Sequence, residues 1–113
     1  MTRSFFGYRG RTMGPFVHVV VVTLKPKATA ALVEHVRDTM GTVSVKLPGF
    51  VGSVLLVSED ETRVSVVSIW NDRHSWAQAQ WEDRIQDTMV DLFKAADHVD
   101  SQSYNEVARY VMS

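Results

Sequence analysis

His18 is the residue of this 113-residue chain whose type and surroundings best suit proton transfer. It is the only ionisable side chain in the otherwise apolar run FVHVVVVTL, residues 16–24. A neutral imidazole, with an unperturbed pKa of about 6.5, can accept or give up a proton at neutral pH. A histidine on an apolar face can also be purely structural, held by one hydrogen bond. The sequence leaves both roles open.

Aromatic residues that could bind a planar molecule lie further along the chain. Trp70 ends an apolar run, and Trp76 and Trp81 follow within one and a half turns of an expected helix. At least one of the last two has to be buried, and an aromatic-lined cavity would suit a planar ligand. Arg84 could balance negative charge on a phenolate or enolate oxygen, although a solvated surface role is also open.

Metal binding and nucleophilic catalysis find little support in the sequence. His35, His74 and His98 have no histidine or carboxylate partner at metal-ligand spacing, so we interpret them as surface residues and expect no metal. A glycine-rich phosphate loop is missing from the sequence, and so is the pattern of a nucleophilic triad.

Composition narrows the class of protein. Hydrophobic residues make up 45% of the chain and charged residues 22%, as expected for one globular domain with a real core. The net charge of −1 gives no reason to expect a nucleic-acid partner, and no apolar run approaches the roughly 20 residues that cross a membrane. Cysteine is absent, which excludes disulfides and iron–sulfur clusters and fits a reducing cytoplasm.

The first 15 residues differ from the rest. They carry three arginines and no acidic residue, and they lack the apolar segment of a secretory signal. We expect a basic tail over residues 1–15, with Met13 as an alternative start of translation, and a single α+β domain over residues 16–113.

Hydrophobic periodicity predicts the order of the elements. The runs 16–24, 50–58 and 64–70 are apolar on both faces, which indicates strands covered on both sides. Helical spacing predicts one helix through residues 32–47 and another over residues 72–96, and residues 99–112 read as a last strand. The order β-α-β-β-α-β is that of the ferredoxin-like α+β fold.

A sheet with helices on one face leaves its other face bare. Here that face would be lined by valine, leucine, isoleucine and tryptophan, too apolar for a monomer to expose. We therefore expect a homodimer in which two sheets pack face to face as a dimeric α+β barrel.

The stretch LPGFVGSVLLVSEDETRVSVVSIWNDRHSW resembles the antibiotic biosynthesis monooxygenase family of dimeric α+β barrels. The likeness rests on a Pro-Gly-Phe turn after the first helix and on a strand that ends in tryptophan just before the second. It implies the barrel fold and a cavity between sheet and helices. The superfamily includes cofactor-free quinone-forming monooxygenases, haem-degrading enzymes, polyketide cyclases and members without known activity.

The resemblance assigns roles residue by residue. Trp70 matches a tryptophan that lines the pocket, whereas Val66 and Trp76 replace an asparagine and a tyrosine of the monooxygenases. Gln80 stands where the haem-degrading enzymes have their iron ligand, so we expect no haem and no other cofactor. His18 matches a histidine that acts as acid or base in the cyclase group.

Two functions follow from these residues. The first is a cofactor-free, monooxygenase-like enzyme, or a polyketide cyclase-like one, acting on an aromatic or polyketide-type molecule. His18 and Trp70 would be its catalytic residues, and the expected substrate-binding residues are Val66, Trp76, Trp81 and Arg84. The second is a non-catalytic dimeric protein that binds a small molecule. A polar cluster around His18 would favour the enzyme, and a wholly apolar cavity the binding protein.

Overall fold

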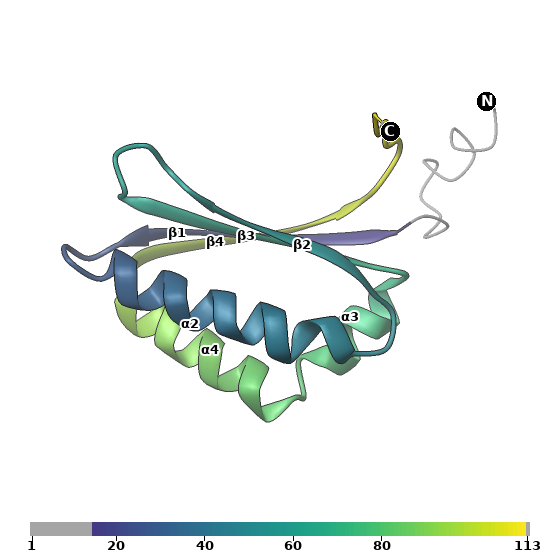
Figure 1. Ribbon diagram of the computed structural model, residues 1–113, viewed down its shortest axis with the longest axis horizontal. Coiled ribbons are helices and arrows are strands. Elements are labelled where there is room, and N and C mark those ends of the chain that lie inside the picture. The colour runs from purple at the N-terminus through teal and green to yellow at the C-terminus, as the bar shows by residue number, and fades with distance from the viewer. Residues whose placement is uncertain (1–14, 113) are drawn as a thin grey trace.

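Four antiparallel strands carry the fold, and all helices lie on one face of their sheet (Figure 1). The computed structural model describes residues 15–112, so the predicted basic tail, apart from Pro15, and the alternative start at Met13 lie outside the described residues. The sheet order is β2-β3-β1-β4. The strands are β1 (Phe16–Leu24), β2 (Phe50–Val57), β3 (Arg63–Trp70) and β4 (Ala96–Asn105).

The helical layer consists of three α-helices and one short 3-10 turn. They are α2 (Thr29–Thr42), η1 (Ser44–Lys46), α3 (Arg73–Ala79) and α4 (Asp83–Ala95). Helices α2 and α4 lie side by side beneath the sheet, and α3 covers the end where β3 finishes (Figure 1). The predicted ferredoxin-like α+β fold is confirmed.

Alternation along β1 builds the core. Every second side chain of this strand faces the helices, and Val20, Val22 and Leu24 are buried there. They pack in one cluster with Leu32 of α2 and Leu92 of α4. Burial of these side chains supplies most of the force that holds the helices to the sheet.

The predicted single helix over residues 72–96 is wrong, because a turn at residues 80–82 interrupts the helix and separates α3 from α4. Asp72 is the N-cap of α3, and Glu82, in an extended conformation, is the N-cap of α4. Carbonyl groups at the end of a helix lack partners within it. Here the side-chain amide of Gln80 donates to the carbonyl of Trp76, and that of Gln86 donates to the carbonyl of Gln80.

Three other predicted ends differ as well. The first helix stops at Thr42, with η1 in place of the expected last turn. The last strand starts earlier than predicted, at Ala96, and ends at Asn105 rather than Met112. Its partner β1 begins opposite Asn105, so the last ladder contact is the bond from the Glu106 amide to the Pro15 carbonyl.

Gly49 makes the turn into β2 possible. Its φ of +80° lies in the left-handed region, and a Cβ at this position would lie 2.1 Å from Oγ of Ser75. The Gly49 carbonyl accepts a hydrogen bond from the amide of Asn71, just after β3. The Pro-Gly-Phe turn thereby holds α3 against the end of the sheet.

Within the described residues 15–112, no helix covers the second face of the sheet (Figure 1). Its central row runs Val54, Val67, Val19 and Gln102 across the four strands. Val54 and Leu56 of β2 are about half exposed, and so is Tyr104 of β4. The residues after β4 rise on this same side, and their apolar side chains Tyr110, Val111 and Met112 are almost fully exposed.

Truncation of Leu32 tests the packing of the helices. Leu32 is 4% exposed, so Leu32→Ala should lower the free energy of unfolding by about 2–5 kcal/mol. Val90 of α4 is 49% exposed, and Val90→Ala should change it by no more than about 0.5 kcal/mol. Urea unfolding at one protein concentration measures both. Equal losses in the two variants would contradict the core described here.

Candidate functional site

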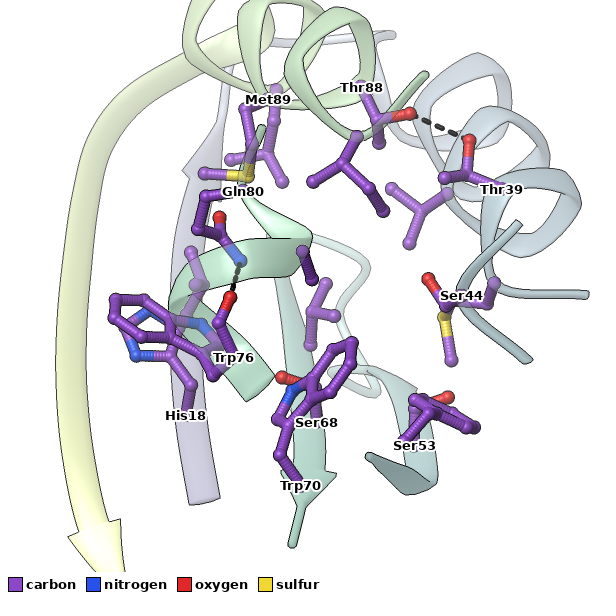
Figure 2. A pocket seen from close by; sticks show the side chains of 18 residues that line it. His18, Thr39, Ser44, Ser53, Ser68, Trp70, Trp76, Gln80, Thr88 and Met89 are labelled. Atoms are coloured by element: carbon purple, nitrogen blue, oxygen red, sulfur yellow. Dashed lines mark hydrogen bonds between the residues drawn. The ribbon is translucent and has the colours of Figure 1, made fainter. Parts of the chain in front are cut away.

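A cavity of about 100 Å³ lies between the helix face of the sheet and the helical layer (Figure 2). Its wall is mostly apolar and includes the rings of Phe50, Trp70 and Trp76. Polar groups also face it, namely His18, Thr39, Ser44, Ser53, Ser68, Gln80 and Thr88. A polar cluster therefore accompanies His18, as the enzyme hypothesis requires.

The pairing of the strands explains where the polar groups come from. On the helix face, one row across the sheet consists of Ser53, Ser68, His18 and Ser103. The next row toward the end of β3 holds Phe50, Trp70 and Phe16. The serines had not been predicted as site residues. Their signal in the sequence is a small polar residue at an inward position of an otherwise apolar strand.

Trp70, one of the residues that line this cavity, carries a hydrogen-bond donor without a partner. The residue is buried, and the edge of Phe50 packs against its ring at a centroid distance of 5.3 Å. The indole Nε1 is buried and has no hydrogen-bond partner. Leaving such a donor unpaired costs about 1–3 kcal/mol. A ligand with an acceptor atom, such as a carbonyl or phenolate oxygen, would recover that cost.

His18 sits beside Trp76, with 4.7 Å between the ring centroids (Figure 2). Its Nδ1 lies 3.2 Å from Oγ of Ser103, and its Nε2 lies 3.0 Å from Oγ of Ser101. In a neutral imidazole one nitrogen donates and the other accepts, and the serine hydroxyls can serve either tautomer. Both serines belong to β4, so this strand orients the imidazole.

Burial lowers the pKa of His18 below its ordinary value of 6.5, and the positive charge of Arg73 lowers it further. Arg73 starts α3, and its guanidinium lies 5.6 Å from the Phe16 ring centroid and 5.9 Å from that of Trp76. His18 is therefore neutral at pH 7. A neutral imidazole is the form that can take a proton from a substrate.

The structure brings together some of the predicted site residues and separates others. His18, Val66, Trp70 and Trp76 all line the cavity. Trp81 is 75% exposed in the break between α3 and α4 and does not line the cavity. Arg84 lies on the outer surface of α4, where its guanidinium binds the carboxylate of Asp38 at 3.0 Å. Neither residue reaches the cavity.

Within residues 15–112, no group of three histidine or acidic side chains could hold a metal ion. Gln80, at the position of the haem ligand, lines the cavity but donates its amide to the Trp76 carbonyl at 3.1 Å. An amide is a poor replacement for imidazole on iron, and this one is already engaged. In the same range no helix is long and apolar enough to span a membrane.

The chain belongs to the antibiotic biosynthesis monooxygenase family, whose profile matches residues 15–90. The fold and the cavity agree with that membership. No curated protein sequence matches the chain.

Solved structures share the fold at low sequence identity. A protein from Shewanella oneidensis is 21% identical with a TM-score of 0.76, over 85% of this chain and 95% of that one. A protein from Mycobacterium tuberculosis is 14% identical with a TM-score of 0.76, over 87% and 100%. A point mutant of SnoaB, a cofactor-independent oxygenase from Streptomyces nogalater, is 17% identical with a TM-score of 0.72, over 87% and 96%.

The titration of His18 tests the electrostatics of the site. Because the folded protein binds the His18 proton more weakly than the unfolded chain does, the contribution of His18 to stability is present above pH 6.5. It is lost as the pH falls from 6.5 through the folded-state pKa. Histidine NMR spectra recorded against pH, assigned with His18→Gln, should give a pKa below 6.5, and Arg73→Gln should raise it. A pKa at or above 6.5 would contradict the burial of this imidazole.

Proposed function

We propose that this protein is a cofactor-independent monooxygenase that oxidises a planar phenol or enol of aromatic or polyketide type. The observation that carries the proposal is the unpaired indole donor of Trp70 in the cavity wall, beside a histidine whose pKa is lowered. Family membership and the structural relative described as a cofactor-independent oxygenase support it.

The size of the cavity limits the substrate. An aromatic-lined space of about 100 Å³ is smaller than the cavity of about 150 Å³ known to hold benzene. Even a single-ring substrate would therefore extend into the open side of the cavity. One ring would lie among Phe50, Trp70 and Trp76, with an oxygen accepting from Nε1 of Trp70.

His18 supplies the base. In one tautomer its Nε2 accepts a hydrogen bond from the Ser101 hydroxyl, and a substrate hydroxyl would take the place of that donor. Transfer of the substrate proton to the imidazole leaves an electron-rich anion, which can pass an electron to dioxygen directly. The Trp70 indole would stabilise the negative oxygen, because a donor aimed at developing charge is most effective in a dry site.

Proton and electron counts balance for a naphthol. 1,5-Dihydroxynaphthalene and one dioxygen give 5-hydroxy-1,4-naphthoquinone and one water. The substrate loses four electrons and two protons, one from its hydroxyl and one from the attacked carbon. One oxygen atom becomes the new carbonyl group and the other becomes water.

The bonds at His18 also favour a second candidate, a binding protein without turnover. Both ring nitrogens already have serine partners, at 3.2 and 3.0 Å, as expected for a structural histidine. Such a protein would bind a planar phenol or quinone through Trp70 and release it unchanged. Turnover separates the two functions, because both require the same cavity.

We further propose that two copies pair through the uncovered face of the sheet. The apolar row Val54, Val67 and Val19 would pack against the same row of a second copy. The exposed C-terminal residues Tyr110, Val111 and Met112 rise on the same side and would be covered in that assembly.

Sedimentation equilibrium tests the pairing. The wild-type protein should have about twice the chain mass of 12.7 kDa at micromolar concentration. Val67→Asp places a charge at the centre of the apolar row and should give the monomer mass. Val90→Asp, on the exposed side of α4, should leave the dimer intact. A monomeric wild type would contradict the proposal.

Oxidation of 1,5-dihydroxynaphthalene tests the activity. The wild-type protein should consume one dioxygen per quinone formed, measured with an oxygen electrode and by visible absorbance. His18→Gln keeps the size of the side chain but removes the base, so turnover should fall about 10²-fold or more. Trp70→Phe removes the indole donor together with part of the buried ring, and it should raise KM or lower kcat about 10-fold or more.

Trp81→Phe is the matched control for Trp70→Phe, because Trp81 lies outside the cavity and should leave turnover unchanged. Wild-type protein that binds the naphthol but gives no quinone above the rate of the buffer would contradict the enzyme and favour the binding protein.

A further inference from the structure

A line of hydrogen bonds crosses the interface between α2 and α4. Oγ1 of Thr39 lies 2.7 Å from Oγ1 of Thr88 (Figure 2), and Thr88 Oγ1 lies 3.2 Å from Nε2 of His35. Nδ1 of the same imidazole lies 2.7 Å from a carboxylate oxygen of Asp91. The carboxylate of Asp91, the imidazole of His35 and the hydroxyl of Thr88 therefore form a continuous hydrogen-bonded chain. His35, interpreted from the sequence as a surface residue, is partly exposed and also contacts Thr88 and Asp91 of α4.

Helical spacing aligns these residues. His35 and Thr39 are four residues apart on α2, and Thr88 and Asp91 are three apart on α4, so each pair occupies one face of its helix. The helices run antiparallel, because the contacts of α2 with α4 pass from His35–Asp91 to Asp38–Arg84. Sequence spacing within one helix could not reveal a partner on the other.

The line leads from the cavity to solvent. Thr39 and Thr88 are buried and line the cavity. The side chain of His35 is 32% exposed and that of Asp91 is 51% exposed. A proton can therefore enter at the outer end, while the inner end meets whatever occupies the cavity.

Thr88 has more hydrogen-bond partners than protons. Its hydroxyl contacts the Arg84 carbonyl at 2.9 Å, Oγ1 of Thr39 and Nε2 of His35, yet it carries one hydrogen. When His35 carries protons on both nitrogens, Thr88 accepts from Nε2 and its own proton is free to point elsewhere. When His35 is neutral with its proton on Nδ1, Thr88 donates to Nε2. The hydroxyl thus follows the protonation of the imidazole.

We propose that Asp91, His35 and Thr88 form a proton relay that serves the helix side of the cavity, opposite the base on the sheet. The proposal rests on the proposed oxidation. There, His18 removes the substrate proton, and the peroxide formed when dioxygen joins the ring carbon needs a proton before its O–O bond breaks. Thr88 is the group that touches the substrate, and His35 and Asp91 act through it.

The relay completes the proton balance. The Thr88 hydroxyl protonates the peroxide and takes the Nε2 proton of His35 in return, leaving the imidazole neutral and bonded to Asp91. Loss of the proton from the attacked carbon lets the C–H electron pair form the carbonyl as the O–O bond breaks. Hydroxide leaves with the O–O electrons and takes the proton lost from the attacked carbon to become water. His18 gives the substrate's hydroxyl proton to solvent. His35 then recovers its proton from solvent.

Oxidation of 1,5-dihydroxynaphthalene by purified full-length variants tests the relay. Thr88→Val keeps the shape but removes the hydroxyl, so kcat should fall about 10-fold or more with KM changed less than about twofold. The solvent deuterium isotope effect on kcat should rise. Thr88→Ser restores the hydroxyl and should recover kcat to within about threefold of wild type.

His35→Gln provides a second variant at a partly exposed position, and it should lower kcat as Thr88→Val does. The control is Glu34→Gln, which should keep wild-type kcat. Glu34 is next to His35 on α2 and is paired with Arg37. Thermal unfolding of each variant shows that the fold is retained.

The outcomes separate the relay from the proposed function. If His18→Gln loses turnover but Thr88→Val and His35→Gln both retain it, the relay is overturned and the oxidation stands. If Thr88→Ser is as slow as Thr88→Val, the loss comes from packing, and the relay is also overturned. If wild-type protein forms no quinone, the proposed oxidation fails and the relay fails with it.

Discussion

The antiparallel register between β1 and β3 decides what the cavity is made of. It places Phe16 opposite Trp70, His18 opposite Ser68, and Val20 opposite Val66, all on the helix face. A shift of β1 by one residue would turn Phe16, His18 and Val20 to the other face of the sheet, away from their partners on β3. The aromatic row, the polar row and the apolar core therefore exist only in this register.

Polar groups in the cavity are arranged so that few of them lack a partner. The nitrogens of His18 contact two serines of β4, and the hydroxyls of Thr39 and Thr88 contact each other. Among buried side-chain atoms of residues 15–112, only Nε1 of Trp70 has no partner. Because an unpaired buried donor is costly, its position indicates where an acceptor atom of a ligand would bind.

Much of the fold could be predicted from the sequence because strands and helices have different hydrophobic periods. The apolar runs 16–24, 50–58 and 64–70 were predicted as strands, and β1, β2 and β3 match them to within one residue at each end. The break at Gln80–Glu82 escaped prediction, because Trp81 continues the apolar period although its side chain points to solvent. The end of β4 depends on where its partner β1 begins. This pairing joins distant parts of the chain, so local periodicity does not reveal it.

Site residues could be predicted only where the local sequence of a single strand marks them. His18 and Trp70 stand out locally, whereas the row of serines and the contacts of His35 depend on pairing between distant segments. Arg84 was predicted to bind substrate because of its charge. In the structure it binds Asp38, 46 residues away in the sequence, on the surface. Long-range contacts decide which polar residues reach the cavity.

We propose that a planar ligand occupies the cavity with an oxygen bonded to Nε1 of Trp70, and NMR spectra of the indole protons can detect that bond. The chain has three tryptophans, and Trp70→Phe assigns the signal of interest. On addition of 5-hydroxy-1,4-naphthoquinone, the account predicts a saturable downfield shift of the Trp70 indole proton and little change for exposed Trp81. An unchanged Trp70 signal at saturating quinone would contradict it.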